Sequence, residues 1–174
     1  MRDYGAARTG SLYRVGPDLA PERILSPVTV PNALCWSPDD RTLYFADTPE
    51  GTIRAYAFDA DSGRIGAMRL LFEGEAGKPD GATVDAEGCV WNARYGGGAV
   101  LRLTPDGRVD RRIEIPASQV TACAFGGPGL RTLFVTTARQ RLTPEQLQRQ
   151  PLAGSLFAVD AGVQGLPEPD FLPG

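Results

Sequence analysis

The sequence contains no histidine. This absence excludes catalytic Ser-His-Asp and Cys-His arrangements and metal sites built on imidazole. The three cysteines, Cys35, Cys89 and Cys123, are widely spaced and form no C-x-x-C pair, which excludes a zinc ribbon and a thioredoxin-type motif. Each cysteine lies beside apolar residues, so we expect buried free thiols in a reducing, cytoplasmic compartment. Any metal must then be bound by oxygen ligands from Asp, Glu, Asn or the backbone.

Long apolar runs and clusters of basic residues are also missing. No stretch reaches the ~20 apolar residues of a membrane-spanning helix, and residues 1–4 contain no apolar segment of signal-peptide type. The net charge is −3, and no group of Lys and Arg stands out. We therefore expect neither a membrane nor a nucleic acid as a partner.

Glycine and proline are abundant, with 21 and 15 residues, which argues against a helical bundle because both interrupt helices. The chain instead repeats an apolar strand that runs into an acidic or glycine turn. The four copies of this strand lie at residues 11–15, 53–58, 100–103 and 156–159. A second element, a turn followed by a β-rich run, precedes three of them at residues 37–46, 85–93 and 127–136. Several strands in each unit of 40–50 residues is the pattern of β-propeller blades.

The repeats predict an all-β fold, a partial propeller of about three and a half blades, because propellers close with ~4–8 blades. We expect three four-stranded blades and one partial blade, with residues 1–174 as the C-terminal portion of a single propeller domain. The last interval contains an insertion at residues 140–151, where Thr143 is a candidate N-cap and Pro144 the first residue of a short helix.

Several motifs resemble one known family. Residues 31–39, P-N-A-L-C-W-S-P-D, resemble an N-G-L-x-W-S-P-D signature. P-D-G-A-T-V-D-A-E-G at residues 79–88 and R-Q-P-L-A-G at residues 149–154 follow in the family's order. The family is that of gluconolactonase, regucalcin (senescence marker protein) and luciferin-regenerating enzyme. The resemblance implies a six-bladed propeller with a divalent metal in its central channel, and hydrolysis of a small-molecule sugar lactone.

The resemblance also implies site residues. It makes Asn32 and Asp80 metal ligands, and Asp80 in addition the catalytic residue that takes a proton from the attacking water. Ca²⁺ suits such oxygen ligands best, with Zn²⁺, Mg²⁺ or Mn²⁺ as alternatives. Without the motifs, Asn32 and Asp80 would be ordinary turn residues. A family glutamate ligand has no counterpart here, and an acidic substrate contact aligns weakly with Asp3.

Other polar and aromatic residues are given structural roles. We expect the turn acids Asp39, Asp85, Glu87 and Asp106 to be structural, and Asp47 and Thr48 to form a hydrogen bond within a blade. Trp36 and Trp91 are expected to pack between blades, and residues 96–98 to form a hairpin turn. Asn92 stands where the family has an apolar residue, and we expect it to be solvated. Ala33 replaces the family's usual glycine after Asn32 and restricts the backbone there.

Two alternatives to a lactonase remain at this stage. One is a non-catalytic half-propeller that assembles with another chain, and the other is a propeller binding module. Whatever its function, a partial propeller would leave blade edges open, and open edges favour self-association because their backbone groups are unpaired.

Overall fold

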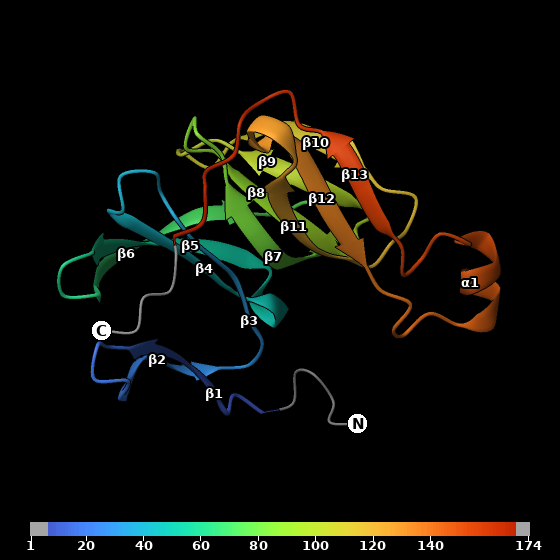
Figure 1. The fold of residues 1–174 in the computed structure, drawn as a ribbon. Helices are drawn as coiled ribbons and strands as arrows, with labels where there is room; N and C mark the ends of the chain where they lie inside the picture. The colour runs from blue at the N-terminus through green and yellow to red at the C-terminus, as the bar shows by residue number, and fades with distance from the viewer. Residues whose placement is uncertain (1–6, 170–174) are drawn as a thin grey trace.

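The computed structural model describes residues 7–169, which form four antiparallel β-sheets that follow one another in chain order (Figure 1). The first sheet pairs β1 (Gly10–Val15) with β2 (Pro21–Val28). The second contains β3 (Pro31–Trp36), β4 (Thr42–Asp47), β5 (Thr52–Asp59) and β6 (Arg64–Glu73). The third contains β7 (Lys78–Val84), β8 (Val90–Tyr95), β9 (Ala99–Leu103) and β10 (Val109–Glu114). The fourth contains β11 (Val120–Gly126), β12 (Thr132–Thr137) and β13 (Leu156–Asp160).

Three strands define the region that matters for the site. Each of β3, β7 and β11 is the first strand of its sheet and lies at one edge of it. β7 packs against both β3 and β11, so these three edges lie next to one another. This succession of meandering sheets with adjacent first strands is a propeller-like arrangement. The repeated strands predicted from the sequence are confirmed as β1, β5, β9 and β13, and the second element is confirmed as β4, β8 and β12.

The predicted number of strands in the third complete unit is wrong. The sheet of β11, β12 and β13 has three strands within residues 7–169, not four. After β13 the chain leaves this sheet: Gly165 forms a bridge with Asp85 of the neighbouring unit. Pro167 and Pro169 follow, and proline has no N–H to donate to a strand ladder. The segment therefore crosses between units and does not extend its own sheet.

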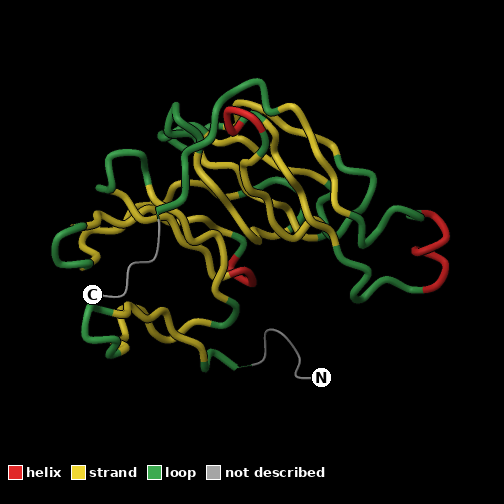
Figure 2. Tube along the Cα trace, in the orientation of Figure 1, coloured by secondary structure: helices red, strands yellow, loops and turns green. Residues whose placement is uncertain are grey.

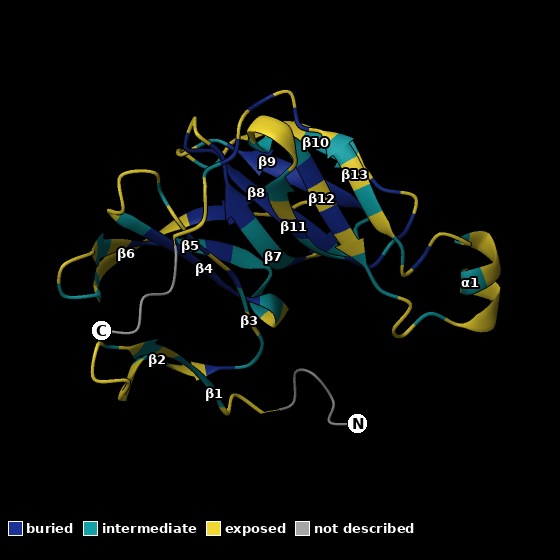
Figure 3. Cartoon of the chain, in the orientation of Figure 1, coloured by how far each residue is buried: buried dark blue, intermediate teal, exposed yellow. Residues whose placement is uncertain are grey.

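The apolar core lies between the sheets (Figure 3). Trp91 is completely buried and meets Phe125 of the next sheet edge to face, with ring centroids 5.8 Å apart. This confirms the packing role predicted for Trp91. Trp36 does not share it: this side chain is 38% exposed and contacts Phe58 of its own sheet. The alternation of side chains along β3 explains the difference, because it buries Ala33 and Cys35 and turns Trp36 outward.

The predicted structural role of the turn acids is clearest at Asp85, which is fully buried. Its carboxylate accepts hydrogen bonds from Trp91 Nε1 and Arg102 Nε, both at 2.8 Å, and from the backbone N–H groups of Glu87 and Cys89. Arg102 also pairs with Glu87 and Asp110. Asp85 therefore connects the turn between β7 and β8, through hydrogen bonds, to the two middle strands of the sheet, β8 and β9.

A single α-helix is found in residues 7–169, α1 (Pro144–Arg149), and it lies away from the sheets (Figure 2). Thr143 is its N-cap: Gln146 N–H donates to Thr143 Oγ1 at 3.3 Å, and Thr143 N–H donates to Gln146 Oε1 at 2.8 Å. This reciprocal pair is a capping box, and it confirms the helix start predicted from the sequence. Two short 3₁₀ turns, η1 (Thr48–Glu50) and η2 (Pro128–Leu130), complete the described elements. No helix in the described range is long and apolar enough to cross a membrane.

Candidate functional site

A cavity of about 450 Å³ lies where the first strands of three sheets meet. Asn32 of β3, Asp80 of β7 and Thr121 of β11 all line it. The structure therefore brings the two site residues predicted from the sequence to one cavity. Neither lies in an isolated turn, because both are inside strands. Thr121 was not predicted, although it holds the corresponding place on β11.

Each of these strands is irregular at or next to the residue that faces the cavity. The pairing with the neighbouring strand shifts between Asn32 and Cys35 in β3, between Pro79 and Ala82 in β7, and between Val120 and Ala122 in β11. At each place the inner strand has one more residue than its partner, which is a β-bulge. A bulge interrupts the alternation of side chains and redirects one of them. Here the bulges allow polar side chains to face the cavity from strands whose neighbouring residues belong to the core.

Asn32 is held by a short chain of hydrogen bonds. Its Nδ2 donates to Thr48 Oγ1 at 2.8 Å, and Thr48 Oγ1 donates to the carbonyl of Pro79 at 2.8 Å. The amide nitrogen is thereby engaged, and Oδ1 is the atom left to accept from, or coordinate, a ligand. Thr48 thus connects Asn32 to the residue that precedes Asp80. The next residue, Ala33, is buried with a φ of 53°, a conformation that glycine adopts more readily, as the sequence comparison with the family's motif predicts.

Asp80 is half-buried, and it forms no ion pair within residues 7–169. Burial raises the pKa of its carboxyl group from 3.8 to about 6, and a hydrogen bond from the Gly81 N–H acts weakly in the opposite direction. The residue after it, Gly81, allows β7 to approach β11: a Cβ at this position would lie 2.7 Å from Ala122 Cβ. The P-D-G sequence therefore combines a carboxylate at the cavity with the close packing of two sheets.

Asn92 supports the backbone on which Asp80 lies, and the expectation that it is solvated is wrong. The residue is completely buried on β8. Its Nδ2 donates to the carbonyls of Asp80 at 3.1 Å and Gly81 at 3.4 Å, and its Oδ1 accepts from Arg94 at 3.3 Å. The bulge in β7 removes these two carbonyls from the regular ladder, and a buried carbonyl requires a donor. An apolar residue at position 92 would supply none.

Arg94 extends this support to the loop before β7. Its side chain is also completely buried, and NH2 donates to the carbonyls of Gly74 and Gly77, both at 2.9 Å. Burial lowers the pKa of the guanidinium, but an arginine side chain stays protonated in proteins. Together, Asn92 and Arg94 fix the backbone from residue 74 to residue 81.

The rim of the cavity carries two cationic residues, Lys78 and Arg141. Lys78 Nζ lies 3.4 Å from the carbonyl of Pro49. Tyr95 and Gln140 complete this part of the lining, and the Tyr95 hydroxyl donates to the Gln140 carbonyl at 3.5 Å. Lys78 lies on β7 and Arg141 in the segment between β12 and α1, so their proximity to one cavity is not visible in the sequence.

The donor set is compatible with a hard cation. An amide oxygen and a carboxylate are ligands that Ca²⁺ and Mg²⁺ accept, and the unpaired, half-buried carboxylate of Asp80 is electrostatically suited to a positive charge. Residues 7–169 contain no group of three Asp, Glu, Cys or His side chains that would hold a metal by themselves. Asn32 and Asp80 would thus supply part of a coordination shell. Asp3, which the family pattern weakly assigned to the substrate, lies outside the described residues.

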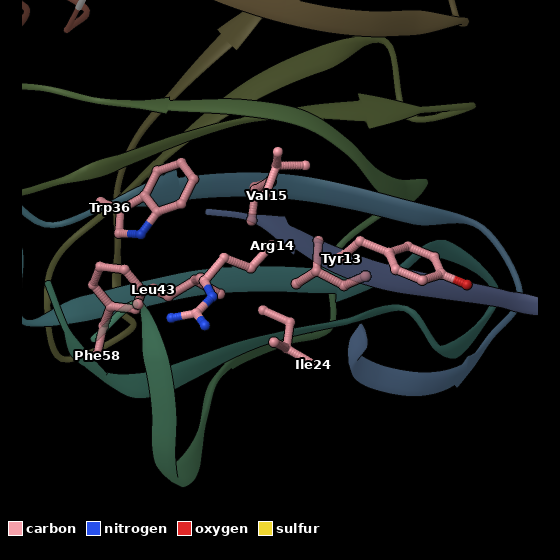
Figure 4. A pocket seen from close by; sticks show the side chains of 10 residues that line it. Tyr13, Arg14, Val15, Ile24, Trp36, Leu43 and Phe58 are labelled. Atoms are coloured by element: carbon pink, nitrogen blue, oxygen red, sulfur yellow. The ribbon is translucent and has the colours of Figure 1, made fainter. Parts of the chain in front are cut away.

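A second cavity, of about 250 Å³, lies between the β1–β2 sheet and the β3–β6 sheet (Figure 4). Its walls are mainly apolar, with Ile24, Leu43 and Phe58 among them, and the indole of Trp36 also faces it. Its charged group, Arg14, is paired with Glu22. Because its lining is mainly apolar and its charged side chain is already in an ion pair, this cavity is better described as an apolar groove.

The fold and the cavity together describe an all-β, propeller-like protein in which an amide and a carboxylate side chain line a cavity where the first strands of three sheets meet. The family SMP-30/Gluconolactonase/LRE-like region matches residues 1–139, and the chain belongs to this family. It is 42% identical over 165 residues to 6-deoxy-6-sulfogluconolactonase of Pseudomonas putida. The alignment covers 93% of this chain and 56% of that protein. It is 37% identical to regucalcin of Oryctolagus cuniculus over 91% of this chain and 54% of that protein.

Solved structures agree with this assignment. The calcium-binding protein regucalcin from Agrobacterium tumefaciens superimposes with a TM-score of 0.86 at 36% identity, over 91% of this chain and 55% of that one. A luciferin-regenerating enzyme gives a TM-score of 0.86 at 32% identity, over 94% of this chain and 57% of that one. The chain spans about half the length of the relatives it matches. The family predicted from the motifs is confirmed.

Proposed function

We propose that this chain forms part of the active site of a sugar-lactone hydrolase that uses a divalent metal, with Ca²⁺ as the first candidate. The observation that carries the proposal is the meeting of Asn32 and Asp80 from two sheets at one cavity. The names of the relatives support the reaction class, since gluconolactonases open cyclic sugar esters. The calcium-binding regucalcin fold supports the choice of metal.

In this proposal, Asn32 Oδ1 and the Asp80 carboxylate hold the metal. When bound, the metal supplies polarisation of the lactone carbonyl and stabilises the negative charge that develops on its oxygen. Thr48 keeps the Asn32 amide in the orientation that presents Oδ1. Asn92 and Arg94 keep the Asp80 backbone in place.

Asp80 has a second role in the proposal, as the group that takes a proton from the attacking water. Its ionised form is needed for both roles. The raised pKa of about 6 places the carboxylate nearer to the pKa of an effective general base than an exposed aspartate would be. A bound cation opposes this rise, because it stabilises the charged form.

The experiment is a pH-stat assay with γ- and δ-aldonolactones across titrations of Ca²⁺, Zn²⁺, Mg²⁺ and Mn²⁺. We expect turnover only with metal. Asp80→Asn should lower kcat by about 10²–10⁴-fold even at saturating metal, because it removes the charge and the base. Asn32→Ala should chiefly weaken metal binding, so added metal should restore part of the rate.

The matched control is Asp106→Asn, which makes the same chemical change in an exposed turn. It should leave the rate unchanged. Normal turnover of Asp80→Asn at saturating metal would refute the role of Asp80, and failure of every metal to support hydrolysis would refute the lactonase proposal.

A second candidate function is assembly with another half-propeller, including a second copy of this chain. β1 has a free edge within the described residues, and the apolar groove beside it contains Tyr13 and Val15, which are 54% and 56% exposed. Unpaired strand edges beside apolar surface favour association. Light scattering at micromolar concentrations tests this, and a stable monomer would argue against it.

A further inference from the structure

We infer that the apolar groove between the β1–β2 sheet and the β3–β6 sheet binds a two-stranded β-segment of another polypeptide. The segment pairs with the free edge of β1, places an aromatic side chain on Trp36 and offers a carboxylate to Arg14. The inference rests on the second candidate function, assembly, and names its surface and partner, but it requires neither lactone hydrolysis nor self-association.

The strand β1 lacks a neighbour that the equivalent strands have. The repeated strands β5 and β9 each pair on both sides, β5 with β4 and β6, and β9 with β8 and β10. Within residues 7–169, β1 pairs only with β2. The strands on the inner side of β5 and β9 are buried over nearly their whole length. A strand added to β1 would therefore pair the backbone of its edge and lie in the interior of the fold.

The interface between the third and fourth sheets shows what such an inner strand contributes. Trp91 of β8 packs edge to face on Phe125 of β11, and the guanidinium carbon of Arg102 lies 5.8 Å from the centroid of the same indole. The Asp85 carboxylate, in the turn before β8, accepts from both Trp91 Nε1 and Arg102 Nε. We call these four residues the Trp91 cluster.

Half of the Trp91 cluster is repeated at the apolar groove. Arg14 holds the place of Arg102, because R-V-G-P-D and R-L-T-P-D begin at these two residues. Trp36 holds the place of Phe125, because each lies four residues after the cavity-lining residue of its strand. Both Arg14 and Trp36 line the groove (Figure 4). The acid and the second-strand aromatic of the cluster have no counterpart among the groove's lining residues in the range 7–169.

The two residues that are repeated have incomplete contacts. The indole of Trp36 is 38% exposed. Arg102 pairs with three acids, whereas Arg14 pairs with Glu22 alone among the described residues. Arg14 Nε is buried without a hydrogen-bond partner in that range, although the same atom of Arg102 donates to Asp85. Because a buried donor without an acceptor costs stability, a ligand that supplies a carboxylate here gains affinity.

The chain itself supplies the probe, since residues 78–95 form the β7–β8 pair that carries Asp85 and Trp91. We would titrate ¹⁵N-labelled protein with this unlabelled peptide under reducing conditions and follow the indole N–H signals of its two tryptophans. The control peptide, residues 99–114, spans the antiparallel pair β9–β10. It carries Arg102, the counterpart of Arg14, and no tryptophan.

We expect the first peptide to shift the Trp36 indole signal in a saturable way and to leave the Trp91 signal of the protein unchanged. It should also slow hydrogen exchange of the β1 amides that do not pair with β2, because these amides gain a partner. The control peptide should have neither effect.

Variants test the ion pair between the segment and the groove. Asp85→Asn in the peptide and Arg14→Met in the protein should each weaken binding by about tenfold, since each removes one side of a charge-assisted hydrogen bond. The two changes together should cost no more than either alone. Arg23→Met is the matched control on the exposed surface of β2, outside the groove, and should bind like the wild type. Should Arg14→Met fail to fold, the Asp85→Asn peptide still tests the pair on the wild-type protein.

No shift of the Trp36 signal at millimolar peptide, or equal shifts with the control peptide, would overturn the inference. Equal affinity of the Asp85→Asn peptide and the original would overturn the role of the carboxylate. A Trp36 signal that moves with protein concentration alone would assign the groove to a second copy of this chain and overturn its assignment to a separate segment. Saturable binding to a chain that light scattering shows to be monomeric would support the inference and refute self-assembly.

Discussion

Replacing Asp80 by Asn should stabilise the metal-free protein at neutral pH. Burial disfavours the ionised carboxylate, which raises its pKa from 3.8 in the unfolded chain to about 6 in the fold. A group whose pKa rises on folding contributes most stability when protonated, below pH 3.8, and this contribution is lost as the pH increases through about 6. At pH 7 the wild-type chain therefore carries an unfavourable buried charge that the amide lacks.

The magnitude follows from the pKa difference. A rise from 3.8 to about 6 corresponds to about 3 kcal/mol at full effect. Because Asp80 is only half-buried, solvent screening reduces this, and we expect a gain of about 1–2 kcal/mol. Metal binding should instead stabilise the wild type relative to Asp80→Asn. A ligand at 100 times its Kd stabilises the state that binds it by about 2.7 kcal/mol, and at a given metal concentration the wild type should gain more than Asp80→Asn, whose neutral amide is the weaker ligand.

Urea unfolding at pH 7 and pH 4, with EDTA or with Ca²⁺, measures both effects. In EDTA, Asp80→Asn should be the more stable protein at pH 7 and lose its advantage at pH 4. With Ca²⁺ at pH 7, the difference in stability between Asp80→Asn and the wild type should become smaller or change sign. Asp106→Asn is the control, because hydrogen bonding from Thr104 lowers the pKa of that exposed carboxyl and no gain is expected. A variant that is no more stable than the wild type at pH 7 in EDTA would refute the account of Asp80 as a destabilising, functional charge.

Three further predictions concern buried groups. Asn92→Leu should cost about 1–3 kcal/mol in urea unfolding, because it leaves the Asp80 and Gly81 carbonyls without their donor, and an unchanged midpoint would contradict this. Arg102→Met should cost about 3–5 kcal/mol, since Asp85 would remain as an unpaired buried charge; a loss below 1 kcal/mol would count against that network. Burial raises the pKa of the Cys123 thiol to about 12, so at pH 8 it should react with a disulfide reagent only after unfolding; rapid native reaction would disprove its inaccessibility.

Much of the fold could be predicted because its signals are local. Turn sequences and apolar runs mark the repeated strands, and a threonine followed by a proline marks the start of α1. The family motifs identify Asn32 and Asp80. The two residues share a cavity because β3 and β7 are neighbours, which the repeat implies but the spacing alone does not show.

The supporting residues could not be predicted in the same way, because their roles depend on register. Asn92 is buried because it lies opposite a bulge in β7, and a bulge is invisible in an apolar-polar pattern. Trp36 is exposed because side chains alternate between the two faces of β3 and position 36 falls on the outward-facing one. Lys78 and Arg141 are 63 positions apart in the printed sequence, and only the arrangement of sheets brings them to one rim.

Because of the bulges in β3, β7 and β11, the residues that stabilise the fold differ from the residues that can contact a ligand. In each of these sheets the pairing of the inner strand is interrupted at or next to the residue that faces the cavity, while the strand remains paired on either side of the bulge. Such a position can change its chemistry without requiring new partners in the ladder. A propeller of this kind can therefore acquire a new specificity one sheet at a time, and a laboratory library confined to residues 32, 80 and 121 would sample that route directly.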